Sequence, residues 1–389
     1  MYDFTKSSDR SNTGAIKHDF APEPVKGSGF IPMTVADTEF PAPPAVNEAV
    51  KRAADHGCYG YTYADKAYMD AVAGWQKRRH SWDIDPDWYV VTNGVVQALG
   101  IAVRAFTEKG DSVLLQSPVY FPFYGAIEDN GRVIVDSPLV NVNGRYEMDF
   151  SDLEEKCARP EVKLMLLCSP HNPIGRVWTE DELKKVAGIA RRHGVTVVSD
   201  EIHNDLIMPG YGHTVFATID PDNCIVCTAV SKTFNLAGLS CSNIFVPNAE
   251  LREKFKKEAH TSGCGCVPYI ARFATIAAYN ECEDWLTELI AVIDGNFRFM
   301  KRFIAERLPR LVLTELEGTY LAWIDARAYG MDHEAMSKFL AENALIADND
   351  GAMFGKNGEG FRRWNIAVPR SELEGALVRL EKALKTLEK

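Results

Sequence analysis

Short apolar runs alternate with amphipathic stretches through the middle of the chain. The runs are rich in Val, Ile and Leu, as in strands buried on both faces of a parallel sheet, and lie at 89–92, 112–115, 163–167, 195–199 and 224–230. Between the third and fourth run, residues 179–193 predict a crossover helix that begins with the capping-box pair Thr179 and Glu182. The alternation predicts an α/β fold whose mostly parallel central sheet is flanked by helices.

The two ends of the chain predict further elements. Residues 1–45 are rich in Pro, Gly and polar residues and predict an extended arm, which leads into a helix over residues 45–57. Towards the other end, residues 315–325 predict a strand, and a further apolar strand starts at Arg362. Residues 373–387 have the spacing of an amphipathic closing helix.

These elements divide the chain into two domains. The parallel strands and their helices make a large domain of residues 46–285. Residues 286–389 make a smaller α+β domain, to which the arm of residues 1–45 is added. The chain has 389 residues, of which 46% are hydrophobic and 25% charged, so it is long enough for both domains and has the composition of a globular protein.

The charge and the hydropathy of the chain limit the kinds of partner that it is expected to bind. A formal net charge of -11 argues against a general affinity for nucleic acid or anionic membrane, because phosphate binding requires a basic surface. No run of about twenty apolar residues occurs, and residues 1–10 lack the hydrophobic core of a signal peptide. We therefore expect no nucleic-acid or membrane partner and a cytoplasmic location.

Nine cysteines are scattered through predicted strands and loops. Cys224 with Cys227, and Cys264 with Cys266, have spacings that suggest metal or redox sites, but a metal site requires two more ligands at suitable spacing. Buried thiols in an intracellular protein act as small hydrophobic side chains. We expect that role for the cysteines and no bound metal.

Two ionisable residues stand at the ends of candidate neighbouring strands. Asp200 closes the run that starts at residue 195, and Lys232 follows the run that ends at residue 230. An amine beside a carboxylate at the mouth of an α/β sheet suits Schiff-base chemistry, in which the amine bonds a carbonyl and the acid tunes the bound group. Solvated surface charges are the alternative, and these two residues alone leave both possibilities open.

Four ordered motifs resemble those of the class I and II aminotransferases, which are fold-type I enzymes that use pyridoxal 5′-phosphate (PLP). They cover nearly the whole chain and read Asn172-Pro-Ile-Gly175, Asp200-Glu201, Ser231-Lys232 and Arg363-Trp-Asn365. Four segments resemble the MalY/PatB-type branch, the cystathionine β-lyase-like C–S lyases: Val35–Phe40, Tyr59–Thr62, Asp200–His203 and Asn365–Arg370. The resemblance implies the fold-type I architecture and PLP as the cofactor.

The resemblance also assigns roles around the PLP ring. Lys232 would bond the cofactor and serve as general base, Asp200 would keep the pyridine nitrogen protonated, and Tyr120 would stack on the ring. Asn172 would donate to the phenolate oxygen. His203 stands where many relatives carry a tyrosine that bonds that oxygen.

A phosphate site is predicted at the turn before the helix of residues 95–106. Free N–H groups at a helix start bind anions with the help of the helix dipole, although the same pattern fits an ordinary strand–turn–helix junction. The resemblance places the PLP phosphate against Gly94, Val95 and Val96, with help from the hydroxyl of Ser231. Many relatives also grip the phosphate with an arginine, and this chain has Ser240 at that position.

Further residues are assigned to the substrate and to a second subunit. Arg363 matches the arginine that grips the substrate carboxylate, to which a guanidinium donates paired hydrogen bonds. Ala36, Tyr120 and Asn172 would line the substrate site. Tyr61 matches a tyrosine that crosses a dimer interface to the cofactor phosphate of the neighbouring subunit, so a catalytic role for Tyr61 implies a homodimer.

The predicted reaction passes through a carbanion at Cα of an L-amino acid. A thiolate on the β-carbon would be expelled, which finally yields a thiol, pyruvate and ammonia; reprotonation at C4′ of the cofactor gives transamination instead. The same residues serve both reactions, so only the resemblance favours a C–S β-lyase over an aminotransferase.

Two other protein classes fit the sequence less well. A dinucleotide-binding dehydrogenase requires a G-x-G-x-x-G turn after a strand, and the chain has none. A non-catalytic regulator with a degenerate aminotransferase-like domain would lack Lys232 or carry a DNA-binding segment.

Overall fold

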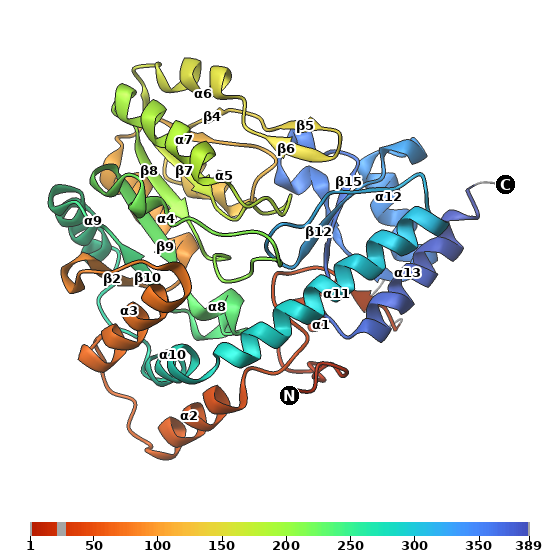
Figure 1. The fold of residues 1–389 in the computed structure, drawn as a ribbon, viewed down its shortest axis with the longest axis horizontal. Helices are drawn as coiled ribbons and strands as arrows, with labels where there is room; N and C mark the ends of the chain where they lie inside the picture. Colours follow the sequence, from red (N-terminus) through yellow and green to blue (C-terminus); the bar gives the residue numbers. More distant parts are fainter. Residues whose placement is uncertain (1, 22–28, 388–389) are drawn as a thin grey trace.

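The computed structural model describes residues 2–21 and 29–387. This part of the chain forms a large lobe around a seven-stranded sheet and a small lobe around a four-stranded sheet (Figure 1). Residues 22–28 of the predicted arm lie outside the described residues.

The sheet of the large lobe is parallel except at one strand. β10 pairs antiparallel with both of its neighbours, β2 and β9, whereas all other neighbouring strands pair parallel. In sheet order the strands are β2 (Tyr89–Thr92), β10 (Ser242–Phe245), β9 (Cys224–Thr228), β8 (Thr196–Asp200), β7 (Val162–Cys168), β3 (Ser112–Leu115) and β4 (Val133–Asp136). The predicted mostly parallel sheet is confirmed, and β10 is an addition that the sequence analysis missed.

Helices cover both faces of this sheet. Side chains of β7 point alternately to its two faces, so Leu164 and Leu166 pack in the layer of α4 (Val95–Phe106), and Met165 and Leu167 pack in the layer of α7 (Glu180–His193). Burial on both sides explains why the strand runs show no alternation with polar residues. The other α-helices of this lobe are α2 (Pro44–Asp55), α3 (Lys66–His80), α5 (Pro122–Glu128), α6 (Phe150–Cys157), the short α8 (Val230–Thr233), α9 (Ala249–Thr261) and α10 (Tyr269–Glu281).

The predicted start of α7 is confirmed. The Thr179 hydroxyl accepts the N–H of Glu182 at 3.2 Å, and the Glu182 carboxylate accepts the N–H of Thr179 at 2.8 Å. This reciprocal capping satisfies two backbone donors that a helix start leaves without partners.

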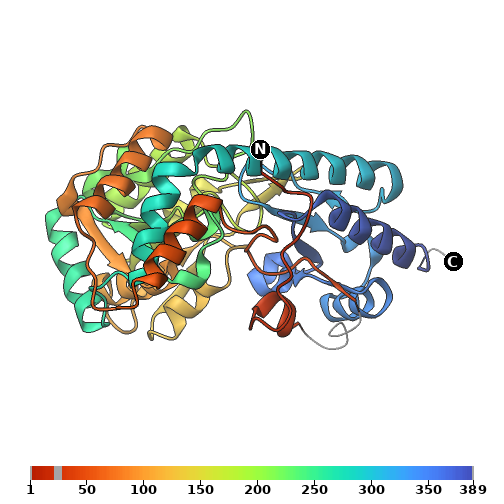
Figure 2. The same cartoon turned by 90° about the horizontal axis from the view of Figure 1, so that it is seen from below.

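The small lobe has an antiparallel sheet covered by helices. Its strands, in order, are β11 (Val312–Leu313), β12 (Leu321–Asp325), β15 (Phe361–Asn365) and β14 (Asn349–Asp350), and its helices are α11 (Glu283–Arg307), α12 (His333–Phe339) and α13 (Arg370–Leu384). Figure 2 shows α11 running from the large lobe along the small one. The predicted boundary between residues 285 and 286 falls in the first turn of α11, and the division into domains stays a prediction.

The strand predicted to start at Arg362 is β15, which begins one residue earlier, at Phe361. β15 ends at Asn365 instead of continuing into the apolar residues that follow. The Asn365 amide donates to the carbonyls of Val35 and Asp37 at 2.7 and 2.6 Å, and its oxygen accepts the N–H of Ala367 at 2.9 Å, so the chain turns here to meet the arm. α13 likewise begins at Arg370 rather than at residue 373, directly after Pro369.

The arm connects the two lobes. It carries α1 (Ile16–Asp19), and its β1 (Ile31–Pro32) pairs parallel with β13 (Ile346–Ala347) of the small lobe. Residues 36–40 then pass by the loop after β9, where Asn235 donates to the carbonyls of Thr38 and Phe40 at 3.0 Å. The arm therefore reaches the ends of the parallel strands.

Within the described residues, no helix is long and apolar enough to cross a membrane. The same part of the chain holds no group of three or more His, Cys, Asp or Glu side chains arranged for a metal ion. Seven of the nine cysteines are buried and none forms a disulfide, which fits the expected role as small hydrophobic side chains.

Candidate active site

Asp200 and Lys232 lie on adjacent strand ends. β8 and β9 pair in parallel, with Asp200 beside Cys227, and Asp200 is the last residue of β8. β9 ends at Thr228, and the short helix α8 (Val230–Thr233) that follows carries Lys232. Because parallel strands end at the same edge of a sheet, the carboxylate and the amine reach one cavity.

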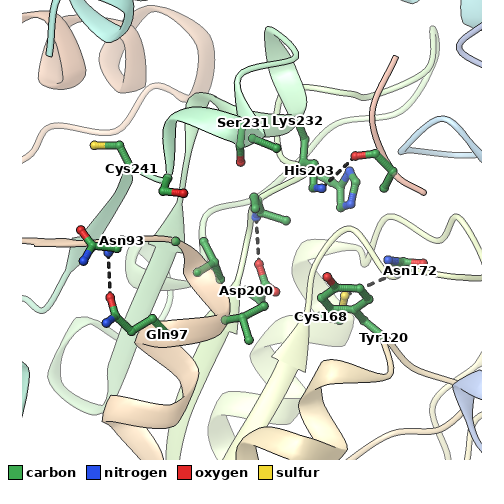
Figure 3. Close-up of a pocket in the computed structure, with 17 residues that line it drawn as sticks. Asn93, Gln97, Tyr120, Cys168, Asn172, Asp200, His203, Ser231, Lys232 and Cys241 are labelled. Carbon is green, nitrogen blue, oxygen red and sulfur yellow. Dashed lines mark hydrogen bonds between the residues drawn. The ribbon is translucent and has the colours of Figure 1, made fainter. Parts of the chain in front are cut away.

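That cavity has a volume of about 260 Å³ and brings together most of the predicted site (Figure 3). Lys232 and Ser231 lie on one side of it, and Asp200 faces them from the strand end. The other predicted residues that line the cavity are Ala36, Gly94, Val95, Val96, Tyr120, Asn172 and His203. The cavity is also lined by Ser240 and by six residues that were not predicted from the sequence: Asn93, Gln97, Cys168, Ile202, Ala237 and Cys241.

The Asp200 carboxyl group is tuned by burial. Burial raises its pKa from 3.8 to about 7, against a hydrogen bond from the Ile202 N–H at 3.1 Å and the positive charge of Lys232. A buried carboxylate of this kind is stabilised by any cationic group that enters the cavity. It is therefore suited to hold a protonated ring nitrogen.

The Lys232 amine is tuned in the opposite direction. Burial lowers its pKa from 10.5 to about 8, opposed by the charge of Asp37. Its Nζ donates to the carbonyl of Ala36 at 2.8 Å, so the arm directs the amine. At pH 7 roughly one such group in ten is neutral, and a neutral amine is the form that attacks a carbonyl or accepts a proton.

His203 is a buried neutral imidazole beside the amine. It is 2% exposed, and burial lowers its pKa well below 6.5. Its ring meets the Tyr320 ring edge-on, with 5.9 Å between the centroids, and its Nδ1 has no hydrogen-bond partner within the described chain. An unsatisfied buried nitrogen costs stability unless something else bonds it, so His203 is suited to a ligand in the cavity.

Asn172 and Arg363 form one unit at the edge of the cavity. The Arg363 Nη1 donates to the Asn172 Oδ1 at 2.9 Å, and its Nη2 donates to the Asn349 Oδ1 at 2.7 Å. Arg363 does not itself line the cavity, and its guanidinium lies 4.7 Å from the centroid of the Phe354 ring. Burial lowers the pKa of Arg363 to about 10.

Arg363 has no acidic partner in the described chain, whereas the adjacent Arg362 pairs with Asp348. The buried Nε of Arg363 also has no hydrogen-bond partner there. A buried cation without a counter-ion favours an incoming anion, and a guanidinium matches the geometry of a carboxylate. This makes Arg363 suited to a substrate carboxylate.

The start of α4 forms the anion end of the cavity. Gly94 stands before the helix with φ +123°, a conformation that glycine adopts without strain, and no side chain caps the helix. The Gly94 N–H is already bonded to the Ser242 hydroxyl at 3.2 Å, and the Asn93 N–H to the Gln97 Oε1 at 2.8 Å. The N–H groups of Val95 and Val96 are therefore the donors suited to an anion.

Lys232 is the only lysine or arginine among the residues that line the cavity in the described chain. Ser240, which replaces the arginine of many relatives, lines the cavity in a left-handed conformation with φ +48°. The negative charge of a phosphate would therefore be stabilised by the start of α4 and by neighbouring hydroxyl groups.

Tyr61 lies apart from the cavity. It is 97% exposed, in the loop between α2 and α3, and it lines a separate surface groove that shares only Asn93 with the cavity. A single chain does not bring Tyr61 to Lys232. Its predicted role requires a second subunit and stays a prediction.

Comparison with known proteins identifies the chain. The profile of the family described as "Aminotransferase class I and II" matches residues 29–380. The chain belongs to this family. This class I and II aminotransferase family member is 42% identical to cystathionine beta-lyase PatB of Bacillus subtilis over 385 residues. The aligned region covers 98% of this chain and 99% of the relative.

Solved structures of other family members agree in fold. Cystalysin from Treponema denticola, whose crystal structure contains PLP, superposes with a TM-score of 0.96 at 42% identity and covers 100% of both chains. The PLP-bound C–S lyase from Staphylococcus hominis, in complex with L-cycloserine, superposes with a TM-score of 0.93 at 34% identity, over 99% of this chain and 98% of that one. The predicted family, fold-type I architecture and PLP cofactor are thereby confirmed.

The cavity fits PLP on its own chemistry. It offers an amine with a lowered pKa, a buried carboxyl group opposite it, and a helix start for a dianion. The Tyr120 ring borders the same space, and an aromatic ring there can lie against a pyridine ring. The individual roles of these residues remain predictions.

Proposed function

We propose that the protein is a PLP-dependent C–S β-lyase that releases a thiol, pyruvate and ammonia from an L-amino acid with sulfur on its β-carbon. In balanced form, the substrate and one water give the thiol, pyruvate and an ammonium ion. The observation that supports this most directly is the half-buried Lys232 amine, which lines one cavity together with the buried Asp200 carboxyl group. The relative that is 42% identical over nearly the whole chain is named a cystathionine beta-lyase, which favours the lyase.

PLP supplies an electron-accepting ring that stabilises negative charge at the substrate Cα. The residues of this chain supply binding and proton transfer. Lys232 removes the proton from Cα, because its lowered pKa leaves a fraction of the amine neutral near pH 7. Asp200 holds a proton on the ring nitrogen, and Asn172 with Arg363 orients the α-carboxylate. Arg363 is already fixed by Asn349, so it loses little freedom when a carboxylate binds.

An aminotransferase is the second candidate, because it would use the same residues. The lyase and aminotransferase activities are distinguished by incubating the purified protein with L-cystathionine and, in a second assay, with an amino acid plus 2-oxoglutarate. We expect pyruvate and a free thiol from cystathionine. A new amino acid without pyruvate would identify an aminotransferase and overturn the lyase.

The homodimer and the cytoplasmic location are also proposed. The homodimer is supported by Tyr61, which is exposed, lines a groove of about 780 Å³ and does not line the cavity of its own chain. An amino acid and a second copy of the chain are the partners we expect, with neither nucleic acid nor membrane among them.

Replacing Arg363 with lysine is expected to raise KM by about 10- to 100-fold with little change in kcat. A charge-assisted bond contributes roughly 1.5–3 kcal/mol, and lysine does not reproduce the paired bonds of a guanidinium. Steady-state kinetics on the cleaved substrate measure this effect. Arg362→Lys is the matched control, because Arg362 pairs with Asp348 and should leave KM unchanged; equal effects of the two substitutions would contradict the assignment.

The rate at which PLP-free protein takes up PLP should rise with pH and level off above about 8. Only the neutral amine adds to the PLP aldehyde, with release of one water. Because burial lowers the pKa of Lys232 from 10.5 to about 8, protonation slows the reaction below pH 8 and no longer limits it above. The visible absorbance of the bound cofactor follows the reaction, and a rate that still climbs toward pH 10.5 would show that Lys232 is not buried as described.

A further inference from the structure

Asp205 is a buried carboxylate that the proposed reaction does not use. It follows Asp200 in the loop after β8 and is 2% exposed. Its Oδ1 accepts from the Trp75 indole N–H at 3.0 Å and lies 2.9 Å from the His80 Nε2, both on α3. Despite the opposing effect of burial, the bond to His80 keeps the pKa of Asp205 below its usual value.

The remaining oxygen of Asp205 reaches the segment that carries Lys232. The Thr233 hydroxyl donates to the Asp205 Oδ2 at 2.8 Å, and Thr233 is fully buried. Thr233 follows Lys232 directly and is the last residue of α8. α8 has only four residues and no side-chain cap, and so short a helix does not hold its own conformation.

Asn235, two residues after Thr233, fixes the segment that carries Lys232 to the arm. The Asn235 amide donates to the carbonyls of Thr38 and Phe40, and its oxygen accepts the Thr38 N–H at 3.1 Å. The same part of the arm offers the Ala36 carbonyl to the Lys232 Nζ. The backbone on which Lys232 stands is therefore fixed from the arm and from Asp205.

The loop after β8 connects these contacts with the opposite wall of the cavity. It starts after Asp200, continues through His203, which lines the cavity, and then reaches Asp205. Its turn is closed by bonds from the Asn204 N–H to the Glu201 carbonyl and from the Leu206 N–H to the His203 carbonyl, both at 2.9 Å. Glu201 is itself fixed by His213 at 2.8 Å and by the Phe216 N–H at 2.9 Å.

From these contacts we infer that Asp205 is a positioning residue which, through the Thr233 hydroxyl, holds the Lys232 amine in register with Asp200. A misplacement of about 1 Å at a reacting group costs a rate of order 100-fold, so a single buried bond at this point acts on the reaction. The inference rests on the proposed role of Lys232. Asp205 touches neither substrate nor cofactor and acts through Thr233.

Thr233→Val tests this role, because valine keeps the shape of threonine and removes the hydroxyl. Thr233→Ser retains the hydroxyl. Thr228→Val is the matched control, since Thr228 is also buried but its hydroxyl donates to the Asn243 carbonyl at 3.2 Å rather than to Asp205. For each protein, the uptake of PLP is followed by absorbance, and kcat and KM are measured with L-cystathionine.

Thr233→Val is expected to slow PLP uptake and to lower kcat by about 10-fold or more, with KM nearly unchanged, because Arg363 and Asn172 are untouched. Thr233→Ser and Thr228→Val should stay within about 2-fold of the original protein. Normal values for Thr233→Val, or equal losses in Thr228→Val, would overturn the inference. If Thr233→Val does not fold, Asp205→Asn is measured in the same way and decides by the same criteria.

These outcomes are distinct from failure of the proposed function. If the unsubstituted protein takes up no PLP, or takes it up without cleaving cystathionine, the lyase proposal falls. In the second case, the uptake measurements still decide the role of Asp205.

Discussion

Lys232→Ala is expected to reduce lyase activity by about 10⁴-fold or more and to remove the covalently held cofactor. In the proposed function the amine both bonds the PLP aldehyde and acts as the base at Cα, and a positioned base alone contributes roughly 10²- to 10⁴-fold. The lowered pKa near 8 and the bond to the Ala36 carbonyl show that the fold prepares this amine in particular. Pyruvate release and the visible absorbance of the purified protein measure the two effects.

Lys232→Arg is the control for charge. It keeps a cation in the cavity but has no amine that is neutral near pH 7, so it should be as inactive as the alanine variant. Substantial activity in either variant would mean that another group performs the proton transfer.

The Lys232→Ala variant also tests the proposed dimer. Mixed with Tyr61→Ala protein under conditions that exchange subunits, it should regain part of the lost activity, because one site of the mixed dimer then has both Lys232 and a partner's tyrosine at position 61. No recovery, although mixed dimers form, would contradict a shared site.

Asp200→Asn is expected to lower kcat by about 10²- to 10³-fold while PLP remains attached. Asparagine has nearly the same shape but carries no charge, so it does not hold a proton on the ring nitrogen, and the loss is comparable to that of one preorganised electrostatic contact in other enzymes. Kinetics on cystathionine and the absorbance of the bound cofactor separate the two properties.

Asp220→Asn is a suitable comparison for Asp200→Asn, because Asp220 is equally buried but pairs with Arg191 away from the cavity. It should leave kcat near that of the original protein. A small effect of Asp200→Asn, or one no larger than that of Asp220→Asn, would contradict the role of Asp200.

The local sequence pattern was enough to predict which strand ends and which helix start surround the site. The apolar runs that became β8 and β9 gave Asp200 and Lys232 their places at strand ends, and parallel pairing put these ends at one edge. The turn before α4 was likewise visible as a strand, a glycine and a helix start. These features depend on residues close together in the sequence, for which propensity and pattern are informative.

Contacts between distant segments were not predictable in this way. Arg362 and Arg363 are adjacent and chemically identical, and only the register of β15 beside β12 and β14 decides which one reaches Asn172. β15 ends early because Asn365 bonds the arm, more than 300 positions away along the chain. The sequence pointed to Arg363 through resemblance alone.

The hydrogen bonds at the start of α4, where the phosphate is expected, were also not predictable from the local sequence. Gly94 was expected to contact the phosphate, yet its N–H is bonded to Ser242 across the pairing of β2 with β10. That pairing is antiparallel and joins strands far apart in the sequence, so no local pattern announces it. The contact of Asp205 with Thr233 was not predictable either, because it joins two separate segments of the chain.

The covalent site is the most direct point to test. Protein loaded with PLP is reduced with borohydride, digested, and its peptides are weighed by mass spectrometry. The pyridoxyl group should be found on the peptide that contains Lys232, and its attachment should depend on that residue. A protein that retains no group, or retains it on another lysine, would contradict the assignment of the cavity between Asp200 and Lys232.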